Sequence, residues 1–256
     1  MSEALRAEWT KLRTLPGTCW LLIGVVILTV AVSVAVASGT HQSSGGGQDP
    51  TKLALAGIDL GQAIVAALAV LAISDEYGTG MIRVTLTAMP RRLVILVAKA
   101  VNVAGLTLVA GVLAVAGCLL AGRLMLPAAG LDPAHGYALV SITNSLTLRA
   151  AAGSVLYLVL IALLSLGVAT AVRDTAVSIG AVLALLYLPP ILAQTVTDPL
   201  RRHIQQIAPM TSGLAIQATT NLRSLPIGPW AGLGVLAAWA VGALLVGGFL
   251  LRIRDA

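Results

Sequence analysis

The sequence predicts an all-α polytopic membrane protein: a bundle of six transmembrane helices, preceded by an amphipathic helix at the cytoplasmic surface. Hydrophobic residues make up 58% of the 256 residues and charged residues only 10%, whereas a water-soluble domain carries roughly 25% charged residues. The apolar residues gather into runs of about 20, the length that an α-helix needs to cross a bilayer. An open sheet cannot replace these helices, because lipid leaves its edge groups without hydrogen-bond partners.

Six apolar runs are the expected spans. The first run also fits the apolar part of a signal peptide, since Ala35-Val36-Ala37 resembles a cleavage site. A retained span is favoured, because the run exceeds the roughly 7–15 residues of such a segment and the acidic Glu3 and Glu8 precede it. Residues 197–229 are expected to be partly helical, with residues 204–218 too short to cross and suited to the outer surface. The six runs cover residues 18–37, 53–73, 93–121, 150–172, 175–196 and 230–251.

The distribution of basic residues predicts the orientation. With the N-terminus inside, most of the 16 lysines and arginines fall on the cytoplasmic side, so both termini are expected in the cytoplasm and the chain in the cytoplasmic membrane. The net charge of +6 does not indicate a nucleic-acid partner, because the basic residues lie at the ends of apolar runs, where anionic lipid head groups attract them. Cys19 and Cys118 fall in opposite leaflets, too far apart for a disulfide, and both are expected to pack as small apolar residues.

Two segments on the cytoplasmic side have the pattern of surface helices. The first, residues 2–15, places Leu5, Trp9 and Leu12 on one helical face and its basic residues elsewhere. It fits a membrane-surface anchor or a helix that also touches a cytoplasmic partner.

The second segment, residues 74–92, joins the second and third runs. Gly78 and Gly80 permit a turn, after which a short helix can continue until Pro90 stops it. Acidic residues begin the segment and arginines end it. Both a helix packed under its own bundle and a docking surface for a partner fit this pattern. The apolar residues that share one face of the helix are Ile82, Leu86 and Met89.

These segments resemble those of the permease subunits of ABC type-2 exporters. The resemblance rests on Glu8-Trp9-Thr10-Lys11-Leu12-Arg13, on Glu76-Tyr77-Gly78-Thr79-Gly80-Met81-Ile82-Arg83 and on Pro90-Arg91-Arg92, and it extends to the six-span layout. In that family both segments contact a cytoplasmic ATPase, and two permease chains, identical or different, work with two ATPases. ATP and Mg²⁺ are then bound by the ATPase partner. The implied ATPase-contacting residues are Glu8, Trp9, Arg13, Asp75, Glu76, Tyr77, Ile82, Arg83 and Leu86.

No motif of catalysis or metal binding occurs in the sequence. It contains no Gly-Lys pair and therefore no P-loop, so this chain is expected to bind no nucleotide cofactor by that route. It also contains no H-E-x-x-H, C-x-x-C or G-x-S-x-G motif, and its three histidines are scattered through the expected outer segments. Asp75-Glu76 with Arg83 resembles a carboxylate motif of intramembrane proteases, but no histidine lies on a neighbouring span to complete it.

Few polar residues lie inside the spans, and each is a candidate for function. Asp59, with Gln62 one turn further on, fits two roles. Asp59 is expected either to line an exit path for cationic or hydrogen-bonding cargo or to pair locally with Arg149 or Arg123. Local pairing is the favoured interpretation. Asn102 is expected to bond across helices, with a place on the cargo path as its second reading.

Other residues in the spans are expected to act in packing and anchoring. Lys99 lies near the cytoplasmic end of its run, and its side chain is expected to reach the lipid head groups. Glycines in the first and third runs are expected to let helices approach closely. They are Gly24, Gly105, Gly111 and Gly117.

Three functions fit the whole pattern. The resemblance implies an exporter permease, and the low polarity of the spans suits an amphipathic or lipid-like small molecule, such as a drug or natural product, as its cargo. A membrane scaffold or immunity protein would bind a partner, move nothing and lack an ATPase-docking surface at residues 75–92. An ion-coupled carrier would need a carboxylate deep in the bundle, for which Asp59 is the candidate.

Overall fold

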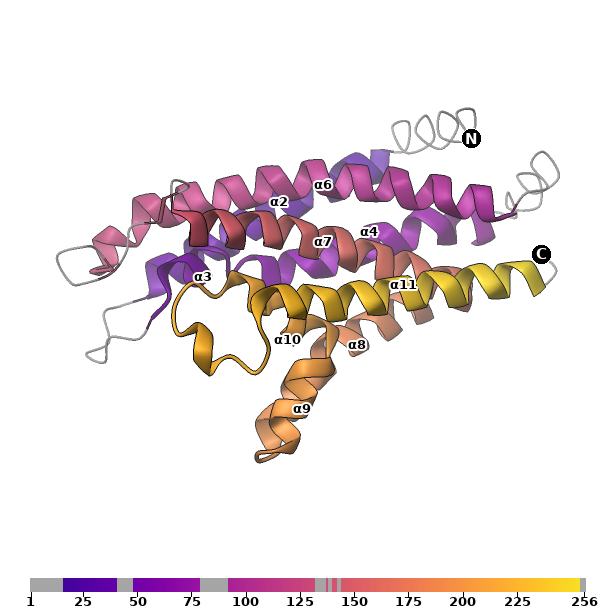
Figure 1. The fold of residues 1–256 in the computed structure, drawn as a ribbon. Coiled ribbons are helices and arrows are strands. Elements are labelled where there is room, and N and C mark those ends of the chain that lie inside the picture. Colours follow the sequence, from indigo (N-terminus) through magenta and orange to yellow (C-terminus); the bar gives the residue numbers. More distant parts are fainter. Residues whose placement is uncertain are drawn as a thin grey trace.

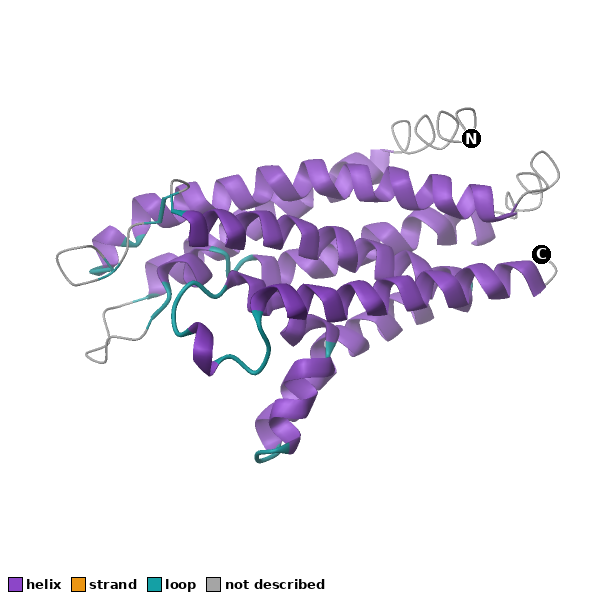
Figure 2. Cartoon of the chain, viewed as in Figure 1, coloured by secondary structure: helices purple, strands orange, loops and turns teal. Residues whose placement is uncertain are grey.

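The long helices of the protein lie side by side in one bundle (Figure 1). The structure, a computed structural model, describes residues 16–40, 48–78, 92–131, 137, 140, 141 and 144–253. Within these residues all regular structure is helical (Figure 2), which confirms the predicted all-α class for this part of the chain. The α-helices are α2 (Pro16–Gly39), α3 (Pro50–Ala54), α4 (Ile58–Gly78), α6 (Arg92–Met125), α7 (Ser145–Val172), α8 (Thr175–Thr195), α9 (Leu200–Ile207), α10 (Pro209–Leu214) and α11 (Pro229–Ile253). Short 3₁₀ turns are η1 (Pro127–Ala129), η3 (Ala215–Gln217) and η4 (Leu222–Ser224).

Successive long helices alternate in direction. Helices α2, α6 and α8 run toward the end of the bundle at which α3 lies (Figure 1). Helices α4, α7 and α11 run back toward the end at which Arg173 caps α7. These ends are called the α3 end and the Arg173 end. Because α2 begins and α11 finishes at the Arg173 end, the start of α2 and the end of α11 lie on the same side of any membrane that the bundle crosses.

Among the described residues, five helices are long and apolar enough to cross a membrane, namely α2, α6, α7, α8 and α11. The chain therefore has the make-up of a multi-pass α-helical membrane protein. The apolar part of α4, Ile58–Ser74, is shorter than these five. The sequence predicted one span over residues 53–73, whereas the chain there forms α3, a turn at residues 55–57 and then α4.

The turn before α4 follows from a close contact with α2. The Gly57 N–H donates a hydrogen bond to Ser33 Oγ at 3.0 Å. A Cβ atom on Gly57 would lie 1.8 Å from the Thr29 carbonyl oxygen, and one on Gly61 would lie 2.1 Å from Thr29 Oγ1. Gly57 and Gly61 thus form a G-x-x-x-G pair that lets the backbones of α2 and α4 approach closely, as small residues do in membrane helices.

Helix α7 is the centre of the bundle and packs against α4, α6, α8 and α11. Its Tyr157, Leu158 and Ile161 are fully buried, and Ile58 and Leu236 of the neighbouring helices belong to the same apolar cluster. A Cβ on Gly167 of α7 would lie 2.5 Å from the backbone of α11. Close packing of small residues therefore joins α7 to α11. In lipid, apolar surface alone gives helices little reason to associate.

The predicted glycine contacts are only partly present in the described chain. Gly117 lies against Val30, with 2.6 Å between a built Cβ and Val30 Cγ2, and Gly111 makes ordinary van der Waals contact. Gly24 and Gly105, in contrast, have nothing within 4 Å of a built Cβ. The prediction for these two was wrong within this chain, because both face away from its other helices.

Two further packing predictions, those for Lys99 and Cys19, need correction. Lys99 is 3% exposed, and its Nζ donates a hydrogen bond to the Ala72 carbonyl of α4 at 3.0 Å. It does not reach outward to head groups, because α4 offers a backbone acceptor beside it. Cys118 packs in the core and accepts a hydrogen bond from Ser33 Oγ at 3.1 Å, whereas Cys19 is exposed; both thiols are free.

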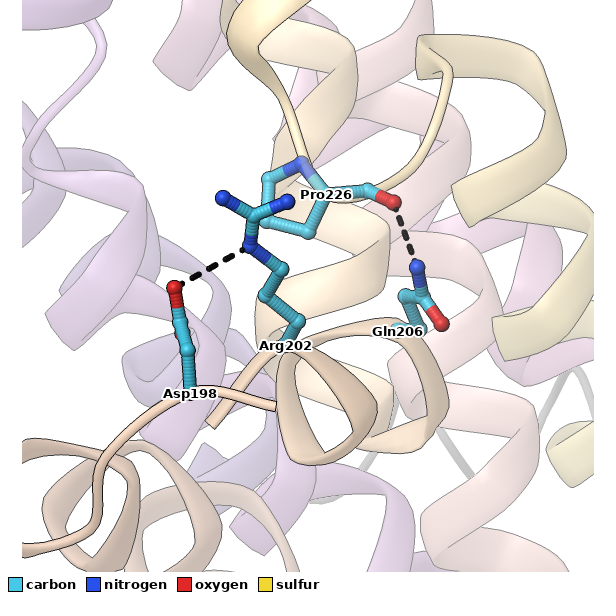
Figure 3. A network of polar contacts seen from close by, with 4 residues as sticks. All are labelled: Asp198, Arg202, Gln206 and Pro226. Atoms are coloured by element: carbon cyan, nitrogen blue, oxygen red, sulfur yellow. Dashed lines mark hydrogen bonds and ion pairs between the residues drawn. The ribbon is translucent and has the colours of Figure 1, made fainter. Parts of the chain in front are cut away.

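The segment between α8 and α11 is partly helical. Helix α9 contacts α8 chiefly, and its far end points away from the bundle (Figure 1). Arg202 pairs with Asp198 at 3.3 Å, and Gln206 Nε2 donates to the Pro226 carbonyl at 2.8 Å (Figure 3). Trp239 Nε1 of α11 donates to the Ile207 carbonyl at 2.9 Å. These bonds fix α9 between the bundle and the loop that precedes α11.

Candidate functional site

A cavity of about 580 Å³ lies at the α3 end of the chain. Its walls come from α3, the start of α4, α9, α10, η3 and the loop before α11. Most of the lining is apolar, including Leu53, Leu214 and Ile227. The residues with polar side chains that line it are Gln48, Asp49, Lys52, Asp59, Gln205, Thr211 and Gln217.

Asp49 holds two walls of this cavity together. As the N-cap of α3, its carboxylate accepts hydrogen bonds from the backbone N–H groups of Thr51 at 3.1 Å and Lys52 at 3.2 Å. This is the usual role of Asp before a helix, because it satisfies donors that have no partner within the helix. The same carboxylate accepts from Thr219 Oγ1 at 2.6 Å, from the Thr219 N–H and from the Thr220 N–H at 3.0 Å. The loop after η3 is thereby fixed to α3.

Arg149 of α7 also contacts the loop after η3. Its guanidinium, in the first turns of α7, donates a hydrogen bond to the Ala218 carbonyl. The favoured prediction placed this guanidinium beside Asp59. In the structure it bonds to the backbone next to η3, and Arg123 is exposed on α6. Asp59 instead shares the cavity with Lys52.

Asp59 is positioned by contacts to its own backbone. Its carbonyl accepts hydrogen bonds from Gln62 Nε2 at 3.1 Å and from the Tyr187 hydroxyl of α8. The Tyr157 hydroxyl of α7 donates to Gln62 Oε1. The first turn of α4 is therefore tied to α7 and α8, while the Asp59 side chain, half-buried, faces the cavity.

Gln217 is a site residue that the sequence analysis missed. Its side chain is 2% exposed and lines the cavity, and its Nε2 has no hydrogen-bond partner. A buried amide donor without an acceptor is uncommon, because leaving it unsatisfied is unfavourable. The signal in the sequence was one glutamine in the apolar stretch Leu214-Ala215-Ile216-Gln217-Ala218.

The three predicted cargo-path residues do not lie together. Asp59 lines the cavity, and Gln62, which is fully buried, lies one turn behind it and does not line it. Asn102 is in α6, in the part toward the Arg173 end, 9% exposed and not part of the cavity. Its place in the helix fits a packing role and separates it from Asp59.

The predicted ATPase-contacting residues lie mostly outside the described residues. Asp75, Glu76 and Tyr77 belong to the last turns of α4, which runs on to Gly78. The prediction began a separate segment at residue 74, so the helix of the second run continues into it. The residues outside the described ranges are Glu8, Trp9, Arg13, Ile82, Arg83 and Leu86.

The charged groups and apolar walls of the cavity suit the binding of a ligand. Its charged lining groups are two carboxylates and one ammonium, Asp49, Asp59 and Lys52, which leaves one formal negative charge. Among the described residues no cluster of three or more His, Cys, Asp or Glu side chains is placed to hold a metal ion. Comparison with protein-family models and with curated proteins gave no match to this chain.

Proposed function

We propose that this chain is the transmembrane permease subunit of an ATP-driven ABC exporter in the cytoplasmic membrane. The observation that carries the proposal is the layout of α4. This helix begins at the amphipathic cavity, with Asp59 in its first turn, and ends in the segment that resembles the ATPase-contacting linker of ABC type-2 permeases. Among the described residues, four of the five helices suited to crossing a membrane, α2, α6, α7 and α8, pack against it.

Helix α4 provides a direct mechanical route between the two ends of the bundle. It has 21 residues, and a rise of about 1.5 Å per residue makes it roughly 30 Å long. Closure of an ATPase dimer against residues 74–92 would push on the Arg173 end of α4. Because a helix moves as a rigid element, the Asp59 end would shift against α7 and α8 and change the cavity.

The absence of a P-loop in the sequence supports a separate ATPase subunit. The cargo that fits the cavity and the apolar spans is an amphipathic small molecule. Two such chains and two ATPases would form the complete exporter, with both termini in the cytoplasm. This orientation agrees with α2 beginning and α11 finishing at the Arg173 end, where Arg252 also lies.

A pull-down from the native membrane tests the proposal. The wild-type chain, solubilised in mild detergent, should co-purify with an ATPase, and the double variant Glu76→Ala/Arg83→Ala should lose it. The matched control is Asp198→Ala/Arg202→Ala, which removes an acidic and a basic residue that pair on the α9 segment. The control should retain the ATPase.

Two outcomes would contradict the proposal. If no ATPase co-purifies with the wild type under mild conditions, a scaffold or an ion-coupled carrier explains the chain better. If the control loses the ATPase as readily as the linker variant does, residues 74–92 are not the coupling element.

A further inference from the structure

We propose that the cavity at the α3 end binds an amphipathic organic cation. Its positive group lies against the Asp59 carboxylate, and a hydrogen-bond acceptor elsewhere in the same molecule accepts from Gln217 Nε2. As a cargo site this inference rests on the proposed exporter function. Binding itself needs no ATPase and is measured on the chain alone.

The three charged groups of the cavity differ in what they offer a ligand. The Asp49 carboxylate already accepts hydrogen bonds from α3 and from the loop after η3. Lys52 is exposed, so water screens its charge. Asp59 is half-buried, and no described group donates a hydrogen bond to its carboxylate, since Gln62 and Tyr187 both donate to its carbonyl oxygen. Asp59 is therefore the group that a cation would pair with.

Gln217 supplies an independent second anchor. Its Nε2 is buried beside the cavity without a partner, while its neighbour Ala218 is held by Arg149 and by the Asp49-bonded loop. The backbone on this wall is therefore fixed, and the amide cannot reach water by a movement of the loop without breaking those bonds. A ligand carbonyl or ether oxygen beside Gln217 satisfies the donor.

The rest of the lining matches the body of such a molecule. The cavity volume of about 580 Å³ falls within the range of about 300–1,000 Å³ that is typical of small-molecule sites. Leu53, Leu214 and Ile227 give it an apolar surface. Binding sites of this kind combine mostly apolar walls with a few placed polar groups that fix orientation. The ligand class is therefore a molecule with one cationic group, one acceptor and an apolar or aromatic body.

The experiment compares two probes of nearly equal shape on the purified full-length chain in lipid nanodiscs. Benzoylcholine carries a quaternary ammonium, an ester carbonyl and a ring, whereas 3,3-dimethylbutyl benzoate has a neutral carbon in place of the nitrogen. Equilibrium binding is measured against empty nanodiscs, which subtracts partition into lipid. Benzoylcholine should bind saturably, and the neutral probe at least about tenfold more weakly, because the neutral probe lacks the positive charge that the Asp59 carboxylate attracts.

Variants locate the site. Asp59→Asn should weaken benzoylcholine binding about tenfold or more and reduce the preference over the neutral probe, because it removes the charge that attracts the ammonium. Gln217→Leu should weaken both probes about five- to tenfold and leave the preference intact, because it removes a neutral donor. The matched controls are Asp198→Asn and Gln194→Leu, two exposed residues that do not line the cavity. Thermal unfolding of every variant shows that it is folded before binding is measured.

The results separate the inference from the proposed function. The inference would be overturned, even if an ATPase co-purifies, by either of two results. One is that the wild type shows no saturable binding of benzoylcholine, and the other is that the Asp59 and Gln217 variants bind it as tightly as the wild type does. Selective binding that both variants weaken would support the site even if no ATPase is found, and only the exporter proposal would then fall.

Discussion

Helices α7 and α8 follow each other in the chain and are both strongly apolar, yet they occupy opposite kinds of environment. Most of α7 is buried among four other helices, whereas α8 leaves Leu188, Ile191 and Leu192 more than half exposed. Since both are long and apolar enough to cross a membrane, their composition does not distinguish a helix that faces protein from one that faces lipid. What distinguishes them is the position of small residues at helix contacts.

Glycine shows this difference most clearly. Gly167 of α7 faces the backbone of α11, and Gly247 of α11 faces Gly167 in return, with 2.6 Å between a built Cβ and the Gly167 carbonyl oxygen. Gly180 of α8 has nothing within 4 Å of a built Cβ. Lipid is as apolar as a leucine side chain, so helices associate where their surfaces fit closely, and an α8 surface without such fit remains exposed.

The largest expected effect comes from filling the space at Gly167. Gly167→Val should prevent close contact of α7 with α11, because the atoms that a Cβ meets are backbone atoms of Ala243 and Leu244 and cannot move aside alone. Overpacking of this kind costs about 1–3 kcal/mol or more. Thermal unfolding in detergent should show a lower midpoint or no folded fraction. Gly180→Val, the same change on α8, should unfold like the wild type, and a large loss there would contradict the distinction between the two helices.

A smaller effect is expected from two tyrosines that bond to the first turn of α4. Tyr157→Phe on α7 removes the donor to Gln62 Oε1 in a fully buried site and should cost about 1–3 kcal/mol, the range for an unsatisfied buried group. Tyr187→Phe on α8 should cost about 1 kcal/mol or less, because the Asp59 carbonyl keeps its bond from Gln62.

Denaturant or thermal unfolding of the two tyrosine variants, measured side by side, provides the check. The reverse order of stability would mean that the contact of α8 with α4, not that of α7, holds the start of α4. The α7 side would then no longer be the more firmly packed of the two.

The positions of the long helices could be predicted from the sequence because a spanning helix needs only a local feature, a run of about 20 apolar residues. The break between α3 and α4 could not, since it depends on Gly57 meeting Ser33 of another helix. The role of Lys99 was missed for the same reason. Its place near the end of a run indicated a surface residue, and the acceptor that buries it belongs to α4.

The candidate site was only partly visible in the sequence. Asp59 stands out as a carboxylate inside an apolar run, so a local pattern sufficed to select it. The residues that share the cavity with it did not stand out. Asp49 meets Thr219 across 170 positions of sequence, and Gln217 lines the same cavity as α3 and α4 because η3 packs against α7 and α11. Such contacts arise from the packing of segments that no short window of sequence contains.

The smallest effect is expected at the exposed ion pair between Asp198 and Arg202, which follows α8 (Figure 3). These side chains are 70% (Arg202) and 56% (Asp198) exposed, so water and salt weaken their attraction. Asp198→Ala should change the free energy of unfolding by about 0.2–1 kcal/mol at most. Asp49→Ala, measured beside it, should cost clearly more, because that carboxylate accepts bonds from two separate segments. If both substitutions proved equally mild, the loop after η3 would be held by packing and not by Asp49. The wall of the cavity that carries Gln217 would then owe its position to the apolar contacts of Ile216 with α7.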